Sequence, residues 1–147
     1  RGWVVHGSGL DEIALHGPTQ VTEIIDDSLQ QKIICPEDFG LQRYPLDAIK
    51  GGTPEENADI IQRILSGQGN PAHNAAVVIN CAALLYLHNK ASDLKTAATI
   101  AQEVLASGKG LQTLETMANL SNRQCNAGKG IPPWAGNNSG KSLHAMT

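Results

Sequence analysis

Two adjacent carboxylates, Asp11 and Glu12, follow a glycine-rich loop at the end of a short apolar run. The run Trp3–Val5 is rich in aromatic and β-branched residues and is predicted to be a strand buried on both faces. The loop Gly7–Gly9 allows a sharp turn at the carboxyl end of that strand, where open α/β sheets place their ligands. Carboxylate oxygens are hard ligands of the kind that Mg²⁺ prefers. The stretch is therefore a candidate magnesium or phosphate site.

An acidic pair alone is weak evidence for a metal, because adjacent carboxylates are common on protein surfaces. Three other pairs occur in this chain, namely Asp26–Asp27, Glu37–Asp38 and Glu55–Glu56. The loop also lacks two known phosphate-binding signatures. Glu12 occupies the position of the third glycine in the dinucleotide fingerprint G-x-G-x-x-G, and the Gly-Lys-Ser/Thr ending of a P-loop is missing. A solvated surface pair therefore remains the alternative interpretation.

Four further polar side chains could contact a ligand, but each has a simpler structural interpretation. His6 ends the predicted strand, where a histidine hydrogen-bonded within the fold is the simpler explanation. His16 and His73 lack a second ligand at metal-binding spacing. Ser8 has no base positioned by the sequence to activate it. No catalytic residue is predicted, and the substrate-binding residues stay unassigned.

Composition limits the class of protein. The 147 residues suffice for one domain with a sizeable core, and 41% hydrophobic with 17% charged residues is typical of a soluble globular protein. A net charge of −3 without a basic cluster argues against nucleic acid as a partner. No apolar run reaches membrane length. The cysteines match neither zinc spacing nor a disulfide framework, which predicts a reducing, cytoplasmic environment; they are Cys35, Cys81 and Cys125.

The predicted elements change from strands to helices along the chain. Residues 19–25 and 29–35 are predicted strands, joined by the turn-forming residues 26–28 into a hairpin. Residues 36–40 are predicted to form a turn or a single helical turn, with Phe39 as a core anchor, and residues 46–50 a short helix.

Four helices are predicted after residue 53. Thr53, Pro54 and Glu56 form the pattern of a capping box at the start of the first helix. The second helix begins at Asn70–Pro71. From Ala75 to Leu87 it is apolar nearly all round and broken only by Asn80, which predicts burial in the core. A third follows Ser92–Asp93 and a short fourth lies near residues 111–117. Strands followed by helices predict an α/β fold with helices packed on a sheet.

The two ends of the chain differ from its middle. Residues 122–147 are rich in Gly, Pro and Asn and are predicted to be a disordered tail, which leaves residues 1–121 as the folded part. The chain opens on Arg1 and a buried-type strand, without a signal peptide, so it is expected to be a piece of a longer protein.

Five motifs occur in the order and spacing of one enzyme family. They are Gly9–Ile13, Gly17–Thr19, Pro36–Leu41, Gly51–Asn57 and Ala72–Val77. Together they resemble anthranilate phosphoribosyltransferase, nearest to the forms fused to a glutamine amidotransferase. The resemblance runs from about residue 3 to residue 121. One such motif is weak evidence, whereas five in register are specific.

The resemblance implies a fold and an activity. The family is a cytoplasmic glycosyltransferase of tryptophan biosynthesis that couples anthranilate to phosphoribosyl pyrophosphate (PRPP) and releases pyrophosphate. Its fold has a small helical domain and a larger α/β domain of the nucleoside phosphorylase/phosphoribosyltransferase type, and this chain resembles the C-terminal part of the latter. The family's Asp-Glu magnesium pair falls on Asp11 and Glu12. The implied cofactor is therefore Mg²⁺, which would neutralise charge on departing pyrophosphate.

Several parts of the family's site have no counterpart in this chain. The glycine-rich phosphate loop, the Lys/Asn/Ser diphosphate contacts, the anthranilate-binding Arg and the helical domain of the family's homodimer interface are missing. The chain alone is therefore expected to be inactive. One alternative is a truncated product that acts only as a packing or assembly module. Another is the related pyrimidine nucleoside phosphorylase group, which the Asp-Glu pair and the run Pro36–Gly40 disfavour.

Overall fold

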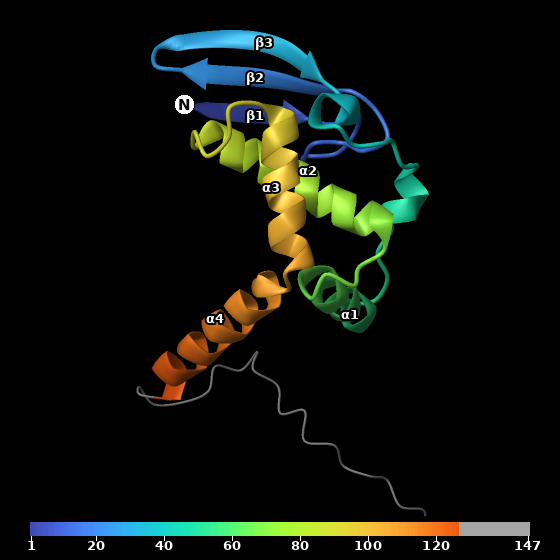
Figure 1. Cartoon of the computed structure of the whole chain (residues 1–147), viewed down its shortest axis with the longest axis vertical. Helices are drawn as coiled ribbons and strands as arrows, with labels where there is room; N and C mark the ends of the chain where they lie inside the picture. Colours follow the sequence, from blue (N-terminus) through green and yellow to red (C-terminus); the bar gives the residue numbers. More distant parts are fainter. Residues whose placement is uncertain (127–147) are drawn as a thin grey trace, which may run out of the picture. The chain divides into compact units, whose positions relative to one another are not determined.

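A computed structural model describes residues 1–126 of the chain, with side chains up to residue 122. Strands come first, then two short 3-10 helices and four α-helices (Figure 1). In chain order they are β1 (Gly2–His6), β2 (Thr19–Ile25), β3 (Ser28–Ile34), η1 (Pro36–Phe39), η2 (Leu46–Ile49), α1 (Pro54–Leu65), α2 (Pro71–Leu87), α3 (Leu94–Ala106) and α4 (Lys109–Asn126). The predicted α/β class, with a hairpin followed by four helices, is confirmed.

The three strands form one antiparallel sheet in the order β1-β2-β3. β2 and β3 make the predicted hairpin, and Asp26 in its turn has a φ of 50°, a conformation that Asp tolerates better than most residues. Helices α2 and α3 lie on one side of this sheet (Figure 1). Val5 and Val21 pack into the core, whereas Val4 is 62% exposed. The prediction of a first strand buried on both faces is wrong, because helices cover only one face.

Side-chain caps fix where the helices begin, as the sequence predicted. The Thr53 hydroxyl accepts a hydrogen bond from the N–H of Glu56, whose carboxylate accepts one from the N–H of Thr53. Asn70 and Asp93 cap α2 and α3, each accepting the N–H of the third helical residue. Because the start of α2 is fixed, so is the set of its residues that faces the core.

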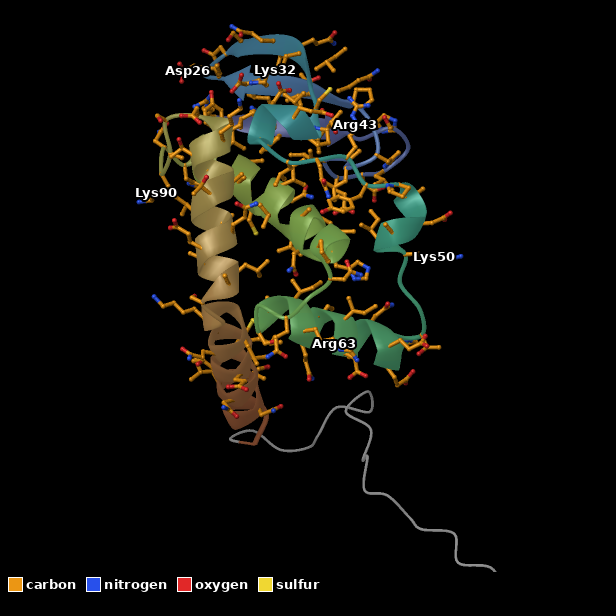
Figure 2. The ribbon with its side chains drawn as sticks, turned by 45° about the vertical axis from the view of Figure 1, so that its right-hand side comes forward. Asp26, Lys32, Arg43, Lys50, Arg63 and Lys90 are labelled. Carbon is orange, nitrogen blue, oxygen red and sulfur yellow. The ribbon has the colours of Figure 1, made fainter. Side chains whose placement is uncertain are left out.

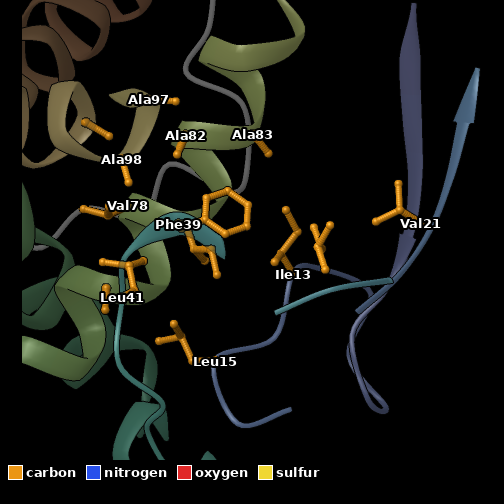
Figure 3. Close-up of a cluster of buried hydrophobic side chains, with 14 residues drawn as sticks. Ile13, Leu15, Val21, Phe39, Leu41, Val78, Ala82, Ala83, Ala97 and Ala98 are labelled. Atoms are coloured by element: carbon orange, nitrogen blue, oxygen red, sulfur yellow. The ribbon is translucent and has the colours of Figure 1, made fainter. Parts of the chain in front are cut away.

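One cluster of buried apolar side chains joins the strands to α2 and α3. Phe39, the only phenylalanine, is 2% exposed and lies in this cluster close to Val78 and Ala82 of α2 (Figure 3). Both helices contribute small residues to this cluster, and small residues allow helices to approach closely. These are Ala75, Ala82, Ala83, Ala97, Ala98 and Ala101.

Burial of α2 is confined to one side. Its buried residues include Val78 and Ile79, but Leu84 is 59% exposed and Cys81 is exposed too. With Val104 of α3, these exposed side chains line an apolar recess of about 620 Å³. The prediction that the apolar helix is buried all round is therefore wrong for this side, because α3 covers only part of its surface.

The end of the described chain is helical. A boundary between two units follows residue 112, near the start of α4, and the expected boundary at residues 121–122 falls inside the same helix. The rest of the predicted tail, residues 127–147, lies outside the described residues. Within residues 1–126, no helix is long and apolar enough to cross a membrane.

A buried carboxylate, Glu23 on β2, links the strands of the sheet. It is 5% exposed and accepts hydrogen bonds from Lys32 at 2.6 Å and from the Arg1 guanidinium at 2.8 and 3.0 Å. Lys32 (Figure 2) also lies 4.4 Å from the centre of the Trp3 ring, and Arg1 lies 4.7 Å from that of Tyr86. The hydrogen bonds from Lys32 and Arg1 lower the pKa of Glu23 from 4.5 to about 2, although burial acts in the opposite direction.

We predict that Glu23 makes the stability of the chain depend on pH. Its pKa is lower in the folded state, so its stabilising effect is complete above pH 4.5 and is lost as the pH falls towards about 2. A pKa shift of this size corresponds to about 3 kcal/mol in the free energy of unfolding. Urea unfolding at both ends of this pH range measures the free energy of unfolding. As the pH falls, this free energy should decrease by about 3 kcal/mol more in the wild type than in Glu23→Gln, whose side chain cannot titrate. Equal losses in the two proteins would contradict the prediction.

Candidate functional site

A two-residue turn closes the end of β1 just before Asp11 and Glu12, which we call the acidic pair. The Gly7 N–H donates to the Leu10 carbonyl at 2.9 Å, and the Leu10 N–H donates back to the Gly7 carbonyl at 3.1 Å. Between them Ser8 and Gly9 have φ values of 50° and 99°, and positive φ at both central residues is typical of tight hairpin turns. The predicted sharp turn is confirmed, with Ser8 rather than Gly7 sharing the positive φ.

Position 7 has no room for a side chain, so it requires glycine. A Cβ atom at this position would overlap the Glu12 carbonyl oxygen and lie 2.7 Å from the Ala14 nitrogen. Only glycine allows two backbone segments to approach this closely. The segment that carries the acidic pair therefore lies directly against the end of β1.

The acidic pair is exposed, but the three residues after it are buried. Ile13, Ala14 and Leu15 are 4%, 0% and 1% exposed. Ile13 and Leu15 point into the apolar cluster (Figure 3). Burial removes the backbone N–H groups of this segment from water, so they need partners within the protein.

Side chains of two other elements provide those partners. Asn80 Oδ1 on α2 accepts a hydrogen bond from the Ile13 N–H at 3.1 Å. Thr19 Oγ1, fully buried at the start of β2, accepts one from the Ala14 N–H at 3.0 Å. In the sequence, Asn80 stands out only as a break in an apolar helix, although a lone polar residue there already indicates a buried partner. Thr19 carries no such signal, because threonine is common in strands.

The buried anchor distinguishes the acidic pair from the other acidic pairs of the chain. Its carboxylates make no hydrogen bond or ion pair within the described part of the chain. By contrast, Glu37 pairs with Arg43 at 2.7 Å, and Glu56 completes the cap of α1. The carboxylates of Asp26 and Asp27 are unpaired among the described residues as well, but this pair lies in the exposed β2–β3 turn and is followed by exposed residues (Figure 2). Among the four pairs, the acidic pair alone combines unpaired carboxylates with a buried anchor.

The other polar candidates serve the local structure. Ser8 Oγ donates to the Pro18 carbonyl at 2.7 Å, and His16 Nε2 lies 3.1 Å from the Ser8 carbonyl oxygen, so both hold the turn in place. His6 is exposed at the end of β1. His73 lies in the first turn of α2, where its N–H donates to the Asn70 side chain.

The donor set of the acidic pair fits Mg²⁺. Among the described residues, no three His, Cys, Asp or Glu side chains come together as a metal-binding group. Asp11 and Glu12 thus offer two carboxylates on a fixed backbone. Mg²⁺ is commonly held by one or two carboxylates and completes its shell with water and substrate phosphates. The pair is therefore suited to a shared site that a phosphate-bearing substrate completes.

A family model covers most of the chain. Residues 1–111 match the model described as "Glycosyl transferase family, a/b domain". The chain belongs to this glycosyl transferase family. The matched residues contain the whole of the acidic pair's surroundings, including Asn80 and Thr19.

Curated relatives of this glycosyl transferase chain share much of its sequence. It is 67% identical over 123 residues to the anthranilate phosphoribosyltransferase of Colwellia psychrerythraea, a match that covers 84% of this chain and 34% of that protein. It is 54% identical over 123 residues to the enzyme of the same name from Aeromonas salmonicida, covering 84% and 36%. The chain thus spans about a third of the length of these relatives.

Solved structures show the same fold. Anthranilate phosphoribosyltransferase from Thermus thermophilus is 40% identical with a TM-score of 0.72, over 79% of this chain and 34% of that one. The Saccharomyces cerevisiae enzyme in complex with PRPP and Mg is 32% identical with a TM-score of 0.68, over 77% and 33%. The resemblance predicted from the five sequence motifs is confirmed.

We predict that Gly7→Ala disturbs the acidic pair's anchor. The added methyl group would force apart the end of β1 and the segment around Ala14, at a cost of about 1–3 kcal/mol in the free energy of unfolding. Gly2→Ala at the other end of β1 is the matched control, because no atom lies within 4 Å of its Cβ position. Urea unfolding of both variants measures the difference. A Gly7→Ala protein as stable as Gly2→Ala would show that the two segments do not press together.

Proposed function

We propose that this chain is the part of an anthranilate phosphoribosyltransferase that supplies the carboxylate ligands of its magnesium ion. The observation that carries the proposal is an exposed acidic pair, unused by the fold and anchored to the core. The 67% identity to the Colwellia enzyme supports the reaction class. A yeast relative solved in complex with PRPP and Mg supports the pairing of metal and substrate.

In the proposed reaction, the bond from the ribose carbon to pyrophosphate breaks as a bond to the anthranilate nitrogen forms, and that nitrogen loses a proton. Mg²⁺, when bound, supplies positive charge that stabilises the departing pyrophosphate. Asp11 and Glu12 would hold the ion, and the buried anchor fixes the backbone that carries both carboxylates before substrate arrives. Such preorganisation avoids an ordering cost during the reaction.

The remaining groups of the site are proposed to come from sequence that the relatives have outside their matched region. These groups include the phosphate loop and the anthranilate-binding Arg that the resemblance implies. The chain alone is accordingly proposed to be inactive. The complete protein is proposed to be a cytoplasmic homodimer that associates through a helical domain outside this chain.

Fragment complementation tests the proposal. The part of the Colwellia enzyme outside its match to this chain would be produced separately and mixed with this chain. Anthranilate consumption with PRPP and Mg²⁺ would then be followed by fluorescence. We predict turnover only when both parts are present. Size-exclusion chromatography would confirm that the two parts have assembled.

Variants of the acidic pair make the same assay specific. Asp11→Asn combined with Glu12→Gln should lower turnover of the assembled complex by roughly 100-fold or more, as expected when groups that stabilise transition-state charge are lost. Asp26→Asn combined with Asp27→Asn is the matched control and should leave turnover unchanged, since this exposed pair lies in the β2–β3 turn. An assembled but inactive wild-type complex would favour the packing-module alternative. Equal turnover in both double variants would show that the acidic pair has no role in the reaction.

A further inference from the structure

Asn80 is the only strongly polar side chain in the apolar part of α2, and its hydrogen bond ends next to the acidic pair. We propose that Asn80 is a positioning residue, which fixes the backbone after Glu12 and so sets where Asp11 and Glu12 stand before a cation binds. This inference rests on the proposed function of the acidic pair as cation ligands. Asn80 itself does not touch the cation.

Both ends of the Asn80 amide are engaged. Its Nδ2 donates to the Ala76 carbonyl at 3.0 Å, one turn back on the same helix. This bond orients the amide so that Oδ1 faces the Ile13 N–H, from which it accepts at 3.1 Å. The neighbouring residue Ile79 is fully buried, so α2 cannot shift without disturbing the core.

The acidic pair lies between two fixed points of the backbone. On one side, Gly7 is held by the turn and by its close approach to Ala14. On the other, the N–H of Ile13, the residue immediately after Glu12, is held by Asn80. Only five residues separate these points, which limits the positions that the acidic pair can take. A hydrophobic residue in place of Asn80 would fill the same space on α2 but would leave the Ile13 N–H buried without an acceptor.

The hydrogen bond can be observed directly in the wild-type chain. NMR can detect a scalar coupling across a hydrogen bond, here between the amide nitrogen of Ile13 and the side-chain carbonyl carbon of Asn80. We expect this coupling together with slow hydrogen exchange of the Ile13 amide. Absence of the coupling with exchange as fast as that of an exposed amide would overturn the proposal without any variant.

Two variants separate positioning from general stability. Asn80→Leu removes the acceptor, and Asn74→Leu is the matched control. Asn74 is a second asparagine of α2, whose Nδ2 donates to the Gly69 carbonyl at 3.1 Å, away from the acidic pair. The readouts are exchange of the Ile13 amide and paramagnetic broadening of the Asp11 and Glu12 amides by Mn²⁺, used as the probe ion.

We expect Asn80→Leu to speed exchange of the Ile13 amide and to weaken Mn²⁺ binding at the acidic pair, each by roughly five- to tenfold, the effect of one lost hydrogen bond. Asn74→Leu should change neither readout. Asn80→Leu leaving both readouts unchanged, or Asn74→Leu changing both as much as Asn80→Leu does, would overturn the positioning role.

Failure of the proposed function gives a different result. If Mn²⁺ broadens no amide of the acidic pair in the wild type, the metal role of Asp11 and Glu12 is contradicted, and with it the positioning role that depends on it. If Mn²⁺ binds the wild type and Asn80→Leu equally well, only the positioning role of Asn80 is overturned.

Discussion

The backbone N–H groups of Ile13 and Ala14 are buried with their side chains, and the arrangement of the site depends on how they are paired. Asn80 accepts one and Thr19 the other, so α2, β2 and the segment after β1 must keep a fixed geometry. A buried N–H group left unpaired costs about 1–3 kcal/mol, a large part of the stability of a small domain. The backbone next to the exposed acidic pair is therefore fixed by the core itself.

The features that hold the acidic pair also hold the fold. The cap at Asn70 fixes the start of α2, and packing of alanines against α3 fixes the face that α2 turns to the strands. On the sheet, Glu23 links β1 and β3 to β2 through Arg1 and Lys32. The contacts that fix the backbone around the acidic pair are thus the same contacts that stabilise the domain.

Local patterns in the sequence predicted the elements well, because caps, turns and alternation involve residues close together in the chain. The capping box at Thr53 and the strand over residues 19–25 were of this kind. The hydrogen bond from Ile13 to Asn80 joins residues 67 positions apart, and no local pattern specifies it. For the same reason, the exposure of Val4 and of one side of α2 was not foreseen. The number of layers that cover a strand or helix is a property of the whole fold.

The candidate site was found by resemblance and not by spacing alone, since three other acidic pairs look alike in the sequence. The structure distinguishes the acidic pair by its buried anchor. The most direct test of its metal role is anomalous X-ray diffraction from crystals of the chain soaked with Mn²⁺ and pyrophosphate. We predict an anomalous peak about 2.1 Å from carboxylate oxygens of Asp11 and Glu12. A peak at Asp26 and Asp27 with none at the acidic pair would contradict it.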